Sequence, residues 1–175
     1  MSVARKFVEH CCLFNGAADE LTLRCWHGGW WAWRTTHWVE VEERQVRSLL
    51  YAFTERAIYE AGKKGMAEWL PTRRKIGDLL EALSVPLLLS NEVEQPCWLD
   101  NRDVAGPIVA TTNGLLDIST KMLLPHSPKF FNVTSVPFAY DPAPQRPDGG
   151  STSSTRCGRR SPTASPFWAS GVAML

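Results

Sequence analysis

The chain has 175 residues, of which 44% are hydrophobic and 21% charged, enough apolar material for one packed domain with a tail. Residues 1–142 carry 15 Lys+Arg against 17 Asp+Glu, a net charge of −2, and residues 143–175 carry a net charge of +3. A slightly acidic body excludes nucleic-acid binding by bulk charge, so any such contact must be a local basic patch.

The first two predicted elements are a helix and an aromatic sheet. Apolar residues recur four apart in residues 3–13, which predicts an amphipathic helix, and Asn15-Gly16 should end it. Residues 21–42 then form short aromatic and β-branched runs separated by Gly28-Gly29 and Thr35-Thr36, the pattern of a three-stranded meander. Because side chains alternate along a strand, Trp31 and Trp33 should share one face, with Trp30 on the other.

A helical pair follows the meander. Helical spacing of apolar residues over 43–62 predicts one helix, with Ala57 and Ile58 in its buried stripe and Gly62 as its stop. The second helix should begin after Pro71 with Thr72 as its N-cap and end at Pro86. Its expected buried stripe is Ile76, Leu79, Leu80 and Leu83.

The last ordered region, residues 106–140, is strand-like again and is punctuated by prolines, which favours a second small β-unit with short edge strands. From Pro142 onward the composition is that of a disordered tail. The sequence therefore predicts an α+β domain over residues 1–142 and a low-complexity tail over residues 143–175.

Motifs for catalysis and metal binding are missing from the sequence. No GxxxxGK[ST] phosphate loop is present. His10-Cys11-Cys12 and Cys25-x-His27 do not repeat with zinc spacing, and we expect neither a metal nor a catalytic residue here. Glu42 and Glu43 suit the N-terminus of a helix better than acid–base catalysis.

Five cysteines in an odd, irregular set indicate a reduced protein. Arg5, Lys6 and Glu9 interrupt the first apolar run, and no run approaches the length of a membrane span. We expect a cytoplasmic protein without membrane contact.

Two features could bind a ligand. The tryptophans of residues 21–42 could stack on bases, sugars or a proline-rich peptide, or they could simply pack a small meander. Arg73-Arg74-Lys75 lies at the start of a predicted helix, where cations oppose the helix dipole. The run is either a solvated face packed on Trp69 or a phosphate contact aided by free backbone N–H groups.

The most distinctive motif is a spaced series near the end of the β-unit. It comprises Asn113, Gly114, Asp117, Thr120, Pro125, His126, Tyr140, Asp141 and Pro142. With the aromatic meander and the Pro71–Leu83 helix, this series resembles the accessory domain that precedes the superfamily III helicase module in phage and plasmid primase–helicases, a family related to poxvirus replicative NTPases. The resemblance covers roughly residues 3–142. It implies that the motif residues are structural.

The resemblance also implies a function. Such a domain would help a helicase module, in cis or in trans and within a ring oligomer, to engage single-stranded or forked DNA during replication. ATP and Mg²⁺ would belong to that module, and this chain would need no cofactor. For the DNA contact we expect Arg73, Arg74 and Lys75, with an exposed meander ring such as Trp33 or Trp38 stacking on a base.

Two alternatives stay open. The chain could be a free-standing Trp-rich module that binds a peptide, a glycan or a host protein. The tail could also be out of frame, in a truncated or frameshifted gene. A DNA string that encodes residues 149–158 also encodes, two bases further on, the start of an amphipathic helix, Trp-Leu-Asp-Phe-Leu-Asp-Ala-Leu-Trp.

Overall fold

The computed structural model describes residues 2–60, 65–100, 102 and 106–142. The backbone forms two units, Met1–Tyr140 and Asp141–Leu175, and all elements below belong to the first. The proposed tail, residues 143–175, and the hypothesis about its reading frame lie outside the described residues.

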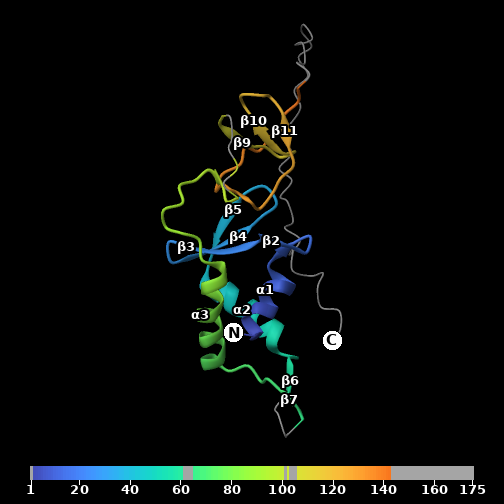
Figure 1. Cartoon of the computed structure of the whole chain (residues 1–175), viewed down its shortest axis with the longest axis vertical. Coiled ribbons are helices and arrows are strands. Elements are labelled where there is room, and N and C mark those ends of the chain that lie inside the picture. The colour runs from blue at the N-terminus through green and yellow to red at the C-terminus, as the bar shows by residue number, and fades with distance from the viewer. Residues whose placement is uncertain (1, 61–64, 101, 103–105, 143–175) are drawn as a thin grey trace, which may run out of the picture. The chain divides into compact units, whose positions relative to one another are not determined.

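Helices and short antiparallel strands alternate along the chain, so the expected α+β class is confirmed (Figure 1). The helices are α1 (Ser2–Cys11), α2 (Glu43–Thr54) and α3 (Arg73–Leu87). The strands are β1 (Leu13–Phe14), β2 (Ala17–Leu21), β3 (Leu23–Trp26), β4 (Gly29–Trp33), β5 (Trp38–Val41), β6 (Ile58–Glu60), β7 (Met66–Glu68), β8 (Cys97–Trp98), β9 (Ile108–Ala110), β10 (Leu115–Asp117), β11 (Leu123–Leu124) and β12 (Phe130–Phe131). Within the described ranges, no helix has the length and apolar character needed to cross a bilayer.

The helices pack as their apolar stripes predict, with changes at their ends. In α3 the hydroxyl of Thr72 accepts a hydrogen bond from the backbone N–H of Lys75 at 3.3 Å, and the predicted stripe from Ile76 to Leu83 is buried. The helix continues through Pro86 to Leu87, so the expected end at Pro86 is wrong by one residue.

The predicted long second helix is wrong beyond Thr54. The hydroxyl of Thr54 donates back to the carbonyl of Leu50 at 2.7 Å, and the helix ends at Thr54. Ile58 and Tyr59 instead enter the β6–β7 hairpin, where Ile58 is 60% exposed rather than part of a buried stripe. β-Branched and aromatic side chains favour a strand at this point, and the apparent helical spacing was fortuitous.

Asn15-Gly16 also differs from its expected role. The first helix ends earlier, at Cys11, and Asn15 and Gly16 form the tight turn between β1 and β2. Their φ angles are 51° and 74°, the left-handed backbone that Asn-Gly adopts readily in two-residue hairpins.

The predicted meander is confirmed as the antiparallel sheet β3-β4-β5. Trp30 and Ala32 on one face pack against the three helices in the main core. Trp33 and Trp38 on the other face pack with Leu89 and Phe131 in a second core. Both faces of this small sheet are therefore covered.

The second β-unit forms the sheet β11-β10-β9 with a small core of its own. The expected strand over residues 132–140 is not formed. That segment instead runs along β9: Val136 N–H donates to Ala110 at 2.8 Å, and Thr112 N–H donates to Phe138 at 3.0 Å.

Candidate functional site

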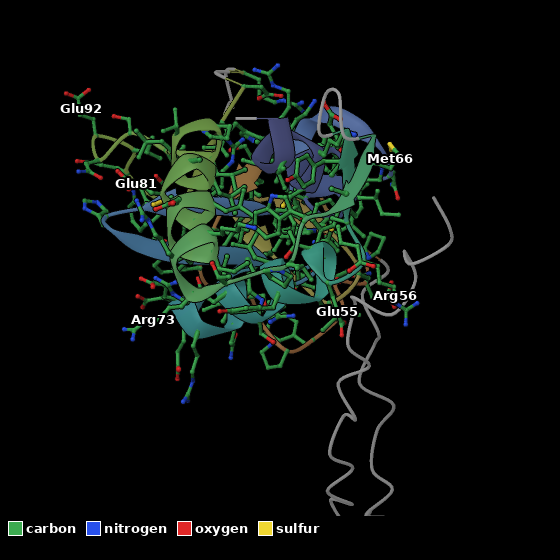
Figure 2. All side chains as sticks on the ribbon, turned by 90° about the horizontal axis from the view of Figure 1, so that it is seen from below. Glu55, Arg56, Met66, Arg73, Glu81 and Glu92 are labelled. Carbon is green, nitrogen blue, oxygen red and sulfur yellow. The ribbon has the colours of Figure 1, made fainter. Side chains whose placement is uncertain are left out.

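Arg73 and Arg74 occupy the first turn of α3, and both are exposed. Among the described residues, no carboxylate forms an ion pair with either guanidinium. The backbone N–H groups of Arg73 and Arg74 have no partner within the helix, whereas that of Lys75 is capped by Thr72. Figure 2 shows Arg73 extending outward at this end of α3.

Lys75 behaves differently from the two arginines. Its Nζ donates to the carbonyls of Trp69 and Leu70 at 2.6 and 3.1 Å, and it lies 5.1 Å from the centre of the Trp69 ring. The ammonium therefore holds the turn that leads into α3, where Leu70 has a φ of 40°. Of the three predicted basic residues, Arg73 and Arg74 are available to an external anion, whereas Lys75 is engaged.

A further arginine, Arg47, comes from α2, and no local sequence pattern places it beside α3. A Cβ added to Gly77 would lie 3.9 Å from an Nη of Arg47, so the Arg47 guanidinium reaches α3 one turn beyond Arg73. Arg47 pairs with Glu43 and Arg44 with Glu42, both at 2.6 Å, so a carboxylate already lies beside each of these cations. The two glutamates occupy the start of α2, as the sequence predicted.

The expected exposure of Trp33 and Trp38 is wrong. Their side chains are 4% and 1% exposed. The physical reason is that Leu89 and Phe131 cover the second face of the meander, which leaves no free ring there for a base. The aromatic residue beside the basic run is Trp69, which is half-buried and has Lys75 over its ring.

The two ends of the sequence motif meet at Asn113. Its Nδ2 donates to the Tyr140 carbonyl at 2.9 Å, and its Oδ1 accepts from the Tyr140 backbone N–H at 2.9 Å. The Thr111 hydroxyl lies 2.9 Å from the same Oδ1 and 2.8 Å from the Gly114 carbonyl. We call this arrangement the Asn113 clamp. It joins two parts of the chain that are 27 residues apart.

Gly114 is required for space. A Cβ at this position would lie 2.5 Å from the Leu124 carbonyl oxygen and 2.8 Å from Leu123 Cγ. Its φ of 159° is also positive, a backbone conformation that residues with a Cβ rarely adopt. The close approach to β11 and the backbone conformation therefore both favour glycine here.

Asp117 and Thr120 build the turn between β10 and β11, as expected. Asp117 Oδ1 accepts from the backbone N–H groups of Ser119 and Thr120 at 2.8 and 3.2 Å, and Thr120 Oγ1 accepts from Met122 N–H at 3.3 Å. These backbone donors, Thr120 foremost, lower the pKa of Asp117 below its ordinary value.

The remaining motif residues have less defined roles. Pro125, Asp141 and Pro142 are exposed. Neither ring nitrogen of His126 is accessible to solvent, and neither has a hydrogen-bond partner within the described part of the chain.

Reactive and metal-binding clusters are not assembled within the described ranges, where no three His, Cys, Asp or Glu side chains converge on a metal site. Burial raises the pKa of the thiols of Cys11, Cys12, Cys25 and Cys97, which makes each a poorer nucleophile. The His37 ring meets two hydroxyls, Thr36 at 2.9 Å and Ser135 at 3.2 Å, but both contact the same Nδ1. This cluster links a turn to a distant segment.

Comparison with known proteins gives one family match. Residues 18–169 match the family described as D5 N terminal like. The match includes the meander, α2, α3 and the Asn113 clamp, and it extends into the residues that the structure does not describe. A comparison with curated proteins gave no match.

Proposed function

Because the chain belongs to the D5 N-terminal-like family, the N-terminal domains of phage and plasmid primase–helicases, we propose that its first unit is an accessory domain that engages DNA during replication. In this proposal, NTP hydrolysis and unwinding are carried out by a helicase module, in cis or in trans, that uses ATP and Mg²⁺. The sequence of this chain contains no phosphate loop for nucleotide hydrolysis.

One observation carries the DNA part of the proposal: Arg73 and Arg74 are exposed and form no ion pair with a described residue at the start of α3. Two guanidinium groups beside free backbone N–H groups form a suitable contact for a phosphate. Residues 1–142 carry a net charge of −2, so electrostatic attraction of DNA to this region must come from such a local patch.

The contact should be weak and insensitive to base sequence. Two cations that neutralise two phosphates of a single strand give a salt slope of about 1.4, at about 0.7 per phosphate. Trp33 and Trp38 are buried, and Lys75 covers one face of Trp69, so stacking contributes little to this model. Phosphate contacts position a strand and do not read its bases.

The test is binding of fluorescent single-stranded DNA to the full chain at low salt. Arg73→Ala/Arg74→Ala should weaken binding and remove most of the salt dependence. Arg34→Ala/Arg56→Ala is the matched control, because it removes the same charge from two other exposed arginines. Figure 2 shows Arg56 well apart from Arg73.

The outcomes separate clearly. Equal weakening by both double variants would mean that bulk charge, and not this patch, attracts DNA. An absence of wild-type binding at low salt would overturn the DNA contact and leave the domain as a protein–protein adaptor within its family.

The alternative Trp-rich binding module has less support. A stacking platform needs exposed rings, yet Trp26, Trp30, Trp33 and Trp38 are all buried. Trp31 is half-buried and contacts Trp26 and Phe131 edge-on. These aromatic residues pack the meander.

A further inference from the structure

An apolar groove of about 360 Å³ lies between α1 and the C-terminal end of α3. Its apolar lining consists of Ala4, Val8, Leu13, Ala82, Val85 and Pro86. The wall formed by α3 is exposed: Val85 is 64% exposed, and Leu88, just beyond the helix, is 63% exposed. When apolar side chains gather around a hollow in the surface, covering them with a partner lowers the free energy.

The rim of this groove carries one charge of each sign. Arg5 and Glu9 lie one turn apart on α1, and both are exposed. Neither forms an ion pair with the other or with any other described residue. A positive charge followed one turn later by a negative one is complementary to itself when the helix direction is reversed.

We propose that this groove is a homodimer interface in which two copies pair about a two-fold axis, with their α1 helices antiparallel. In an isologous interface each residue meets the same partner in both directions. Arg5 then faces the partner subunit's Glu9, and Glu9 faces the partner subunit's Arg5. The apolar walls of the two grooves, Val85 included, cover each other between these pairs.

Charge complementarity selects this occupant over others. A parallel arrangement would oppose Arg5 with the partner subunit's Arg5, which is repulsive. The rim offers an uncharged apolar helix no partner for either charge. An antiparallel second copy satisfies both charges and covers the apolar walls with residues of this same chain.

The first experiment measures association of the full chain by sedimentation over a range of concentrations. The wild type should form dimers as its concentration rises. Val85→Asp places a charge in the covered wall and should abolish the dimer. Arg5→Glu and Glu9→Arg each place like charges opposite one another, and each should raise the dissociation constant by at least about tenfold.

The decisive experiment mixes the two single variants. In Arg5→Glu both rim residues are acidic, and in Glu9→Arg both are basic, so an antiparallel pair made of one copy of each is complementary at both contacts. The mixture should therefore associate although neither variant does so alone. The double variant Arg5→Glu/Glu9→Arg should associate like the wild type. Arg34→Glu and Glu92→Arg, exposed residues outside the groove, are the controls.

Each outcome of these experiments either supports or overturns the proposed dimer interface. A wild type that stays monomeric, or a dimer that tolerates Val85→Asp, overturns the interface. A mixture that does not associate overturns the antiparallel pairing. Circular dichroism of each variant confirms that it is folded, and rescue by mixing cannot arise from unfolded chains. The result is independent of DNA binding, because no residue of the groove belongs to the Arg73–Arg74 contact.

Discussion

The meander β3-β4-β5 and the second β-unit β9-β10-β11 are both three-stranded antiparallel sheets, yet they are stabilised by different means. The meander is held by aromatic burial: Trp38 lies 5.9 Å from Trp33 and 5.5 Å from Phe131, measured between ring centres. The indole N–H groups of Trp26, Trp33 and Trp38 are buried without a partner among the described residues.

The second β-unit relies on polar side chains bonded to backbone. Asn113, Asp117 and Thr111 all bond to main-chain groups, and Gly114 makes room for a carbonyl. Burial tolerates any side chain of suitable volume, whereas such bonds require particular atoms at particular positions. This difference explains why the most recognisable residues of the chain lie in the second β-unit and not in the meander.

Among these variants, Trp38→Ala should cause the largest loss of folding stability. It tests whether the meander is held together by aromatic burial. Removing a fully buried indole costs about 3–5 kcal/mol, a large part of the stability of an ordinary domain. Trp38→Phe should lose much less, because the N–H that it removes has no partner among the described residues. Chemical denaturation measures both. Equal losses would mean that the N–H has a partner after all.

Gly114→Ala should cause an intermediate loss of folding stability. It tests whether the second β-unit depends on the close approach of its backbone at this position. The new methyl group would lie 2.5 Å from the Leu124 carbonyl, so β10 and β11 must separate, at a cost of about 1–3 kcal/mol. Gly77→Ala is the matched control. It lies inside α3 with its nearest neighbour at 3.9 Å and should stabilise the protein by about 0.5–1 kcal/mol. A loss of stability in both variants would contradict this account.

Asp117→Asn should have the smallest effect, visible in the pH dependence. The pKa of Asp117 is lowered in the folded state, so its ionised form stabilises the fold above the unfolded pKa of about 3.9, and this contribution is lost as pH falls through the folded pKa. The variant should therefore lose less unfolding free energy than the wild type between about pH 7 and about pH 3. Asp100, whose pKa is lowered by Arg102, keeps its own pH dependence in both proteins. Identical curves would exclude Asp117 as a contributor.

Local patterns in the sequence predicted much of this fold. The spacing of Ile76, Leu79, Leu80 and Leu83 identified α3, and Thr72 marked its start. The turns after Trp26 and Trp33 identified the meander. In each case the information lies within one element, where periodicity and capping act.

Long-range contacts account for what the sequence did not predict. Trp33 and Trp38 are covered by Leu89 and Phe131, which lie far along the chain, so strand alternation alone could not reveal their burial. The Arg73–Arg74 site was predicted as part of a basic run, but the engagement of Lys75 depends on the turn at Trp69 and Leu70. The nearby Arg47 becomes visible only when α2 packs on α3.

The Asn113 clamp also affects the chemical lifetime of the chain. Asparagine followed by glycine loses ammonia when the glycine nitrogen attacks the side-chain carbonyl, and asparagine is accordingly a thermolabile residue. In Asn113-Gly114 both ends of the amide are bonded to Tyr140, so the side chain cannot turn toward Gly114 until those bonds break. Asn15-Gly16 has the same two residues in an exposed turn without such a clamp. An ageing preparation should therefore deamidate first at Asn15, and deamidation at Asn113 would mark chains whose second β-unit has opened.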